Sequence, residues 1–201
     1  MTELPPTDCV HSADPHAGRP PWEIGAPQPA LKALAQDGAL RGRVLDVGCG
    51  TGEHTLMAAA SGLDATGIDV SADALRAADR KARERGLTVR FLHYDALRLR
   101  EYGETFDTVL DSLVLHAFRA ADRAVYVAGL RTVLRPGGRL FVLCYSDRHT
   151  GNPAVPHRLS RDDLEACFAD GWALESVEPT KCASNLSTEG IAAWLATCTR
   201  I

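Results

Sequence analysis

One glycine-rich segment constrains the fold more than any other part of the chain: residues 44–52, VLDVGCGTG. The short apolar run from Arg43 to Val47 predicts a strand, and the glycines after it predict a turn whose backbone can approach a ligand closely. Residues 53–61 then have a helix-compatible pattern that stops at Gly62. The order of strand, glycine-rich turn and helix is typical of sheets that bind ligands at their strand ends.

The same alternation of strand and helix continues along the chain. Further strands are predicted at 65–70, 88–93, 106–111, 140–145, 172–177 and 191–199. Helices are predicted from the N-cap Ser71 to Gly86, over a face of Val127, Leu130 and Leu134 that ends at Pro136, and from the N-cap Ser160. We therefore expect an α/β fold with a doubly wound sheet, whose ligands lie beyond the carboxyl ends of the strands.

Composition limits the organisation of the chain and its partners. A chain of 201 residues with 45% hydrophobic and 24% charged side chains suits one globular domain, which we place at 21–201 after a flexible arm at 1–20. Lys and Arg number 22 against 26 Asp and Glu, so there is no basic excess for nucleic acid or anionic lipid. No long apolar run or signal pattern occurs. We expect a cytoplasmic monomer or homodimer with neither nucleic-acid nor membrane partners.

The six cysteines also favour the cytoplasm. They are scattered along the chain without a C-x-x-C pair, which disfavours structural zinc and a disulfide framework. Small buried thiols in a reducing environment are the simplest interpretation.

Three carboxylates follow three successive strands. Asp46 precedes the glycine turn, where it would repel a pyrophosphate but could accept a hydrogen bond from an ammonium group. Asp69 ends the second strand at the usual place of a ribose-diol acceptor, and Asp95 follows the third strand, where it could accept from an adenine amine. Each could instead cap the following helix. In register, the three predict a nucleoside site without a phosphate binder.

Five segments in this order resemble the class I S-adenosylmethionine-dependent methyltransferases. They are VLDVGCGTG (44–52), GIDVS (67–71), HYDAL (93–97), FDTVLDS (106–112) and LRPGGRLFV (134–142). The resemblance covers residues 21 to about 200 and implies a seven-stranded, mostly parallel sheet of Rossmann-like type. Its last strand would be antiparallel and formed by the segment that ends at 194–198. The implied cofactor is S-adenosyl-L-methionine, and the implied product is S-adenosyl-L-homocysteine.

The resemblance also implies which residues bind the cofactor. The loop from Gly48 to Gly52 would wrap the methionine part, Asp69 would take the ribose hydroxyls, and Asp95 with Ala96 would hold the adenine. The complete expected set is Trp22, Asp46, Gly48, Cys49, Gly50, Thr51, Gly52, Asp69, Val70, Asp95, Ala96 and Asp111.

A narrower resemblance lies ahead of the first helix, in PPWEIGAPQP at 20–29. This segment is similar to the P-W-x-x-G-x-P-x-P segment of small-molecule methyltransferases near the thiopurine, thiol/halide and actinobacterial quinone or phenol-type enzymes. In those families it folds over the cofactor, which implies that Trp22, Ile24 and Gly25 contact cofactor or acceptor. The alternative is a proline-rich turn whose Trp22 packs on the core.

Candidates for acceptor chemistry follow the fourth and fifth strands. In the resembled quinone and phenol-type enzymes, an Asp-Ser and a following His occupy the stretch that is here Asp111 to His116. His116 is therefore expected to act as a base or to orient the acceptor, unless it is simply a packed histidine. Ser112, Tyr145 and His157 are expected to line the acceptor pocket, although the last two could equally be surface loop residues.

The residues after these two strands also disfavour two related activities. Enzymes that methylate adenine or cytosine amines place a D/N-P-P-Y/F/W segment where this chain has Asp111-Ser112-Leu113-Val114. Metal-dependent catechol-type enzymes need an Asp-Asn pair where this chain has Asp147-Arg148, so we expect no bound metal.

The expected function is transfer of a methyl group from S-adenosylmethionine to oxygen, or sulfur, of a small aromatic or heteroaromatic molecule. His116 favours oxygen, because a phenol gains more than a thiol from a neighbouring base. Three alternatives stay open: a thiol or halide methyltransferase, a nicotinamide-dependent oxidoreductase, and a noncatalytic cofactor-binding protein. The G-x-G-x-G spacing and Asp46 oppose the oxidoreductase.

Overall fold

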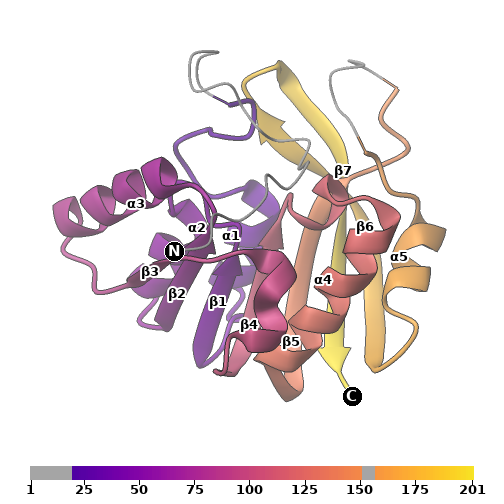
Figure 1. Ribbon diagram of the computed structural model, residues 1–201. Helices are drawn as coiled ribbons and strands as arrows, with labels where there is room; N and C mark the ends of the chain where they lie inside the picture. The colour runs from indigo at the N-terminus through magenta and orange to yellow at the C-terminus, as the bar shows by residue number, and fades with distance from the viewer. Residues whose placement is uncertain (1–19, 151–156) are drawn as a thin grey trace.

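A computed structural model describes residues 20–150 and 157–201, which form a seven-stranded sheet between layers of helices (Figure 1). The strands are β1 (Arg43–Val47), β2 (Asp64–Asp69), β3 (Arg90–His93), β4 (Phe106–Ser112), β5 (Leu134–Tyr145), β6 (Trp172–Ser184) and β7 (Ser187–Arg200). The helices are α1 (Pro29–Gln36), α2 (Glu53–Ala60), α3 (Ala72–Glu84), α4 (Ala120–Val133) and α5 (Arg161–Cys167), with short 3-10 turns η1 (Ala96–Glu101) and η2 (Leu115–Ala117). Apart from Pro20, the arm predicted at 1–20 lies outside the described residues and stays a prediction.

The sheet has the doubly wound topology predicted from the sequence. Its strand order is β3-β2-β1-β4-β5-β7-β6, and the pairs from β3 to β5 are parallel, whereas β7 is antiparallel to both of its neighbours. The chain builds outward from β1 to β3 and then starts again beside β1 with β4. This reversal point is where doubly wound sheets bind ligands, at the carboxyl ends of the strands.

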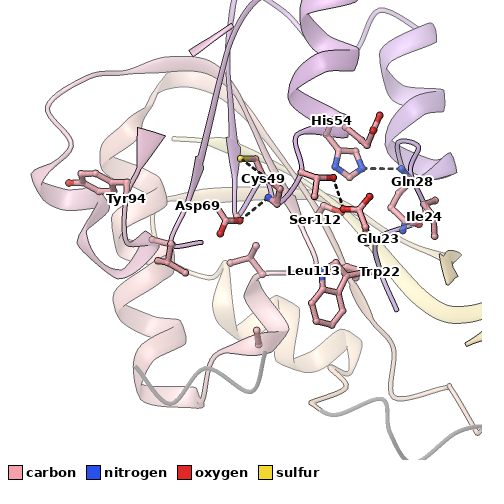
Figure 2. A pocket seen from close by; sticks show the side chains of 18 of the residues that line it. Trp22, Glu23, Ile24, Gln28, Cys49, His54, Asp69, Tyr94, Ser112 and Leu113 are labelled. Carbon is pink, nitrogen blue, oxygen red and sulfur yellow. Dashed lines mark hydrogen bonds between the residues drawn. The ribbon is translucent and has the colours of Figure 1, made fainter. Parts of the chain in front are cut away.

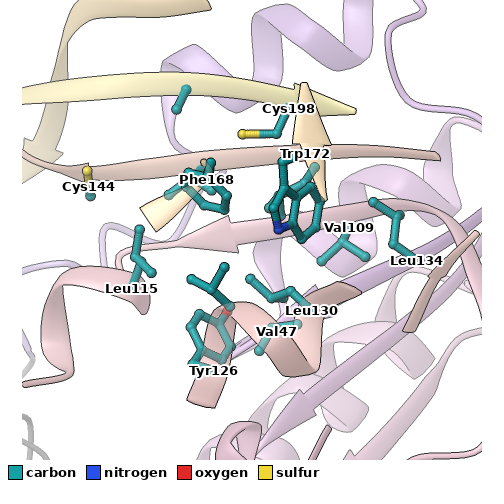
Figure 3. Packing of buried hydrophobic residues seen from close by; sticks show 14 of the residues in the cluster. Val47, Val109, Leu115, Tyr126, Leu130, Leu134, Cys144, Phe168, Trp172 and Cys198 are labelled. Atoms are coloured by element: carbon teal, nitrogen blue, oxygen red, sulfur yellow. The ribbon is translucent and has the colours of Figure 1, made fainter. Parts of the chain in front are cut away.

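Two buried clusters hold the helices to the two faces of the sheet. On one face, side chains of α1 and α2 such as Leu31 and Ala58 join Val44, Phe141 and Leu143 of the strands. The other cluster is larger and gathers residues of α4, α5 and their surroundings against the sheet, including Tyr126, Leu130, Phe168 and Trp172 (Figure 3). The apolar run at 140–145 is buried on both faces, as its unbroken pattern predicts.

Two predicted helix starts are confirmed by their hydrogen bonds. The Ser71 hydroxyl accepts from the backbone N–H of Ala74 at 3.2 Å. Ser160 and Asp163 form a capping box, in which each side chain accepts from the other residue's backbone N–H.

One helix ends earlier than predicted. The sequence pattern places Leu134 on the helical face that runs up to Pro136, but α4 ends at Val133, and Leu134 is extended and pairs with Phe106 of β4. Two causes favour the extended conformation here: Arg135 precedes a proline, which disfavours helical backbone, and the fully buried Leu134 side chain gains a strand neighbour.

The last two strands form a longer hairpin than the predicted strands at 172–177 and 191–199. The extra residues, 178–190, are mostly polar and include Pro179, so they lack the apolar signal of a strand. Proline is tolerated there because β6 is the edge of the sheet. The hairpin turns at Asn185 and Leu186, and its tip stands beyond the carboxyl end of β5, beside the segment that precedes α1 (Figure 1).

Within residues 20–150 and 157–201, no helix has the length and apolar character needed to cross a membrane.

Candidate active site

A cavity of about 210 Å³ lies at the carboxyl ends of β1, β2 and β4 (Figure 2). Five parts of the chain line it: the segment before α1, the glycine turn with the start of α2, the end of β2, the turn after β3, and the turn after β4. The lining residues are Trp22, Glu23, Ile24, Ala26, Gln28, Gly48, Cys49, Gly50, Thr51, Glu53, His54, Asp69, Val70, Tyr94, Asp95, Ala96, Ser112, Leu113, Val114, Ala117 and Phe118.

Nine of the twelve predicted cofactor residues line this cavity, and the exceptions are Asp46, Gly52 and Asp111. Of the predicted acceptor contacts, Trp22, Ile24 and Ser112 line it, whereas Tyr145, His157 and the predicted base His116 do not. Gly25, from the same proline-rich segment, is also not a lining residue.

The glycine turn needs its glycines for two different reasons. Gly48, Gly50 and Gly52 all have left-handed backbone, with φ of 64°, 53° and 85°. A Cβ on Gly48 would stand 2.4 Å from a methyl of Val114, and one on Gly52 would stand 2.8 Å from Ala78. At Gly50 a Cβ would meet nothing within 4 Å, so the backbone of this residue stays open on the cavity side of the turn.

Asp69 and Asp95 both line the cavity and both accept backbone hydrogen bonds, although only Asp95 caps a helical turn. Asp69 accepts hydrogen bonds from the backbone N–H groups of Gly50 and Ser71, both at 2.8 Å, and so holds the glycine turn against β2. Asp95 is the N-cap of η1 and accepts from the N–H of Leu97 at 2.9 Å. A carboxylate has about four acceptor positions. Both side chains therefore keep acceptor capacity for a ligand in the cavity that they line.

Asp46 lies beneath the glycine turn and not at the cavity surface. Its side chain is fully buried; Oδ2 accepts from the Thr55 N–H at 3.0 Å and from the Thr55 hydroxyl at 2.7 Å. Among the described residues, Oδ1 has no hydrogen-bond partner. Burial raises the pKa of Asp46 to about 7, against the opposing effect of the Thr55 hydrogen bonds.

Asp111 is a fully buried carboxylate that turns the chain after β4. It accepts from the N–H of Val114 at 2.9 Å, from the N–H of Leu115 at 3.1 Å and from the Tyr126 hydroxyl at 2.9 Å. Burial raises its pKa to about 6, although these hydrogen bonds favour the ionised form. Through these bonds Asp111 shapes the turn after β4, and this turn forms one wall of the cavity.

That wall contains a strained residue. Leu113 has φ of 70°, a conformation that is uncommon for residues other than glycine, and its N–H donates to the Leu143 carbonyl at 2.8 Å. Its side chain lines the cavity and belongs to the buried cluster against which Trp22 packs. Trp22 also lines the cavity, so both residues contribute apolar surface to it.

The predicted base lies behind this wall. His116 is fully buried in η2, and its ring centroid is 4.5 Å from that of Tyr145. Val114, Ala117 and Phe118 of the same turn line the cavity, whereas Leu115 and His116 do not. His157 is exposed and has φ of 48°. The roles of His116, Tyr145 and His157 in the reaction stay predictions.

Residues 20–28, which we call the strap, contribute side chains that the sequence interpretation missed. The Thr51 hydroxyl donates to Glu23 at 2.5 Å, and Lys81 donates to Thr51 at 2.6 Å and to Glu53 at 2.8 Å. Although burial opposes it, hydrogen bonds from Arg85 and Lys81 lower the pKa of Glu53. These bonds join the strap to the glycine turn, α2 and α3.

His54 is the second group that fixes the strap. Its Nε2 accepts from the backbone N–H of Gln28 at 3.0 Å, and burial lowers its pKa to about 4. The ring is therefore neutral at physiological pH and serves as an acceptor. Glu23 and Gln28 belong to the proline-rich motif, and His54 lies two residues after the glycine turn. Their places in or near these motifs were the signal that could have identified all three.

No group of three or more His, Cys, Asp or Glu side chains within 20–150 and 157–201 could hold a metal ion.

Comparisons with known proteins agree with this geometry. A family model described as a methyltransferase domain matches residues 44–138. The 2-heptyl-1-hydroxyquinolin-4(1H)-one methyltransferase of Mycobacteroides abscessus is 33% identical over 172 residues, which are 84% of this chain and 75% of that protein. Probable thiol methyltransferase 2 of Arabidopsis thaliana is 31% identical over 74% of this chain and 66% of its own length.

A solved structure extends the likeness. The structure titled "Conversion of a Disulfide Bond into a Thioacetal Group during Echinomycin Biosynthesis" is 39% identical, with a TM-score of 0.82 over 90% of this chain and 85% of that one. The chain belongs to the class I S-adenosylmethionine-dependent methyltransferases. It is an enzyme that methylates a small molecule, with S-adenosyl-L-methionine as its cofactor.

The position of Asp69 predicts a direct role in cofactor binding. We expect Asp69→Ala to weaken S-adenosylhomocysteine binding by about 1.5 to 3 kcal/mol, because it removes a charged acceptor and frees the glycine turn. Isothermal calorimetry measures this change. Asp64→Ala is the matched control, since it lies at the other end of the same strand and is exposed. Equal affinities for the two variants would exclude Asp69 from the site.

The buried Asp46 predicts an unusual dependence of stability on pH. With its pKa raised to about 7, the folded state keeps a proton that the unfolded chain releases near pH 4. Raising the pH from about 4 to about 7 therefore opposes folding through this group. Asp46→Asn keeps an acceptor for Thr55 without the ionisation, so its stability relative to wild type should rise across this window. Urea unfolding at several pH values measures it, and parallel curves would contradict the assignment.

Proposed function

We propose that the enzyme transfers a methyl group to oxygen or sulfur of a small molecule with a flat, apolar ring. The observation that supports this is the apolar part of the cavity lining, which consists of Trp22 and Ile24 of the strap and of Leu113, Val114 and Phe118 of the turn after β4. Aromatic and aliphatic walls of this kind suit a ring, and they exclude water from the reacting centre.

The opposite side of the cavity suits the cofactor. Asp69 offers acceptors for ribose hydroxyls, Asp95 with Ala96 and Tyr94 suits an adenine, and the open backbone at Gly50 suits a group that must lie close to the chain. When bound, S-adenosylmethionine supplies an electrophilic methyl group on its sulfonium. The protein's part is to position the acceptor in line with that group and to keep water away.

The ionisable groups of the cavity favour an acceptor that ionises easily. His54 is neutral and already accepts from Gln28, and Glu23 already accepts from Thr51. We propose His116, directly behind the wall, as the group that orients or deprotonates a weakly acidic hydroxyl. The relatives include a hydroxyquinolinone and a thiol methyltransferase, and a ring-bound hydroxyl or a thiol is the acceptor group we propose for this chain.

The test is methylation of a defined panel by the purified protein with S-adenosylmethionine. The panel holds a 1-hydroxyquinolin-4-one, a simple phenol, an aromatic thiol and an aromatic amine, and mass spectrometry identifies the products. We expect O-methyl or S-methyl products from the first three compounds and none from the amine. Methylation of the amine alone, or of no ring compound by a protein that binds S-adenosylhomocysteine, would overturn the proposal.

A substitution at His116 separates oxygen from sulfur chemistry. We expect His116→Asn to lower kcat for the phenol by about 10²-fold or more, the scale of general acid–base catalysis, and to affect the thiol much less. The Kd of S-adenosylhomocysteine should stay within about twofold, since His116 does not line the cavity. Tyr145→Phe is the control, because it keeps the ring that packs on His116. An unchanged kcat for the phenol from pH 6 to 9 would remove His116 from the mechanism.

We also propose that the enzyme works in the cytoplasm. Support comes from its thiols: Cys49, Cys144, Cys167, Cys182 and Cys198 are all free, and burial raises the pKa of each. Protonated thiols, four of them buried and that of Cys167 half-buried, suit a reducing compartment.

A further inference from the structure

The tip of the β6–β7 hairpin is bonded to the strap, although it does not line the cavity. The backbone N–H of Asn185 donates to the Pro21 carbonyl at 2.9 Å. The Asn185 side-chain amide donates to the Glu23 carbonyl at 2.8 Å and to the Pro20 carbonyl at 3.3 Å. One residue of the hairpin thus satisfies three carbonyl groups at the start of the strap.

The other end of the strap is held by the same hairpin. The Gln28 side chain accepts from the Ala183 N–H at 2.8 Å and donates to the Ala183 carbonyl at 3.0 Å. Gln28 is only 2% exposed, so this pair of bonds is shielded from water. Both ends of the strap are therefore attached to residues that lie more than 150 positions away in the chain.

Trp22 and Ile24 lie between these two attachments and line the cavity. On the cavity side, the strap is bonded to the side chains of Thr51 and His54. The local backbone bonds of the strap are two tight turns, from Glu23 to Pro20 and from Ile24 to Trp22. These turns do not fix where the strap lies relative to the sheet, whereas the bonds to the hairpin, to Thr51 and to His54 do.

We infer that Asn185 is a positioning residue, which holds the strap over the cavity and so prepares it to bind the cofactor. The inference concerns the same cavity as the proposed function, but it does not depend on the identity of the acceptor. If the strap is in place for only a fraction of the time, the apparent Kd of a ligand rises by the inverse of that fraction. Residues that never touch the ligand then set its affinity.

The test compares Asn185→Ala with wild type by calorimetry with S-adenosylhomocysteine and by amide hydrogen exchange. Loss of the two side-chain hydrogen bonds should raise the Kd by about three- to tenfold. Exchange should become faster in residues 20–28 and stay unchanged in β1, β4 and β5. Since Asn185 is exposed at a hairpin tip, the melting temperature should change little.

Two further variants separate positioning from general loosening of the hairpin. Ser187→Ala removes the hydroxyl that accepts from the Glu189 N–H within the hairpin and leaves the strap contacts in place, so its Kd should stay within about twofold of wild type. Asn185→Asp keeps the size of the side chain but places a carboxylate against two carbonyl oxygens, and it should weaken binding at least as much as Asn185→Ala. The inference fails if Asn185→Ala leaves Kd and strap exchange unchanged, or if Ser187→Ala has the same effect. Failure of the acceptor panel would leave these outcomes unaffected.

Discussion

The cavity wall that follows the fourth strand depends on one buried carboxylate. Asp111 lies one residue before the end of the fourth strand, inside the core. The chain turns back directly after the strand, and the N–H groups of Val114 and Leu115 donate to the Asp111 carboxylate. The turn forces Leu113 into left-handed backbone and directs the following residues along the cavity. Tyr126, on the opposite side, holds the same carboxylate from α4. A buried charge thus determines the shape of an apolar surface.

Much of the fold and of the cofactor side can be predicted from local sequence. Strand β1 has the predicted bounds, and the glycine turn, Asp69 and Asp95 all lie where a doubly wound sheet brings its strand ends together. These features are readable because each depends on residues close in sequence: an apolar strand, a glycine with left-handed backbone, a carboxylate at the next helix start. The sequence alone leaves capping and ligand binding as alternatives for Asp69 and Asp95. In the structure Asp95 caps η1, whereas Asp69 accepts from Gly50 and Ser71, and a carboxylate has further acceptor positions beside these bonds.

The features that the sequence did not predict depend on contacts between distant segments. Residues 178–190 have no apolar alternation. They extend the hairpin because residues 178–182 pair with residues 191–195 and Ser184 pairs with Ser187, at an edge that tolerates Pro179. The bonds from Asn185 and Gln28 join segments that no periodicity links. Burial also separates Asp46 from the cavity: a carboxylate before a glycine turn can face a ligand or lie beneath the turn, and only packing decides between them.

The residues that line the cavity come from two separate parts of the chain. The residues that the methyltransferase family model matches, 44–138, contain the glycine turn, Asp69, Asp95 and the wall after β4. The strap, at 20–28, lies outside that range. So do Ala183 and Asn185, the hairpin residues that are bonded to it. Changes in these two short pieces can therefore reshape one side of the cavity while residues 44–138 stay the same. For protein engineering, the strap and the hairpin tip should be exchanged together, because each is bonded to the other.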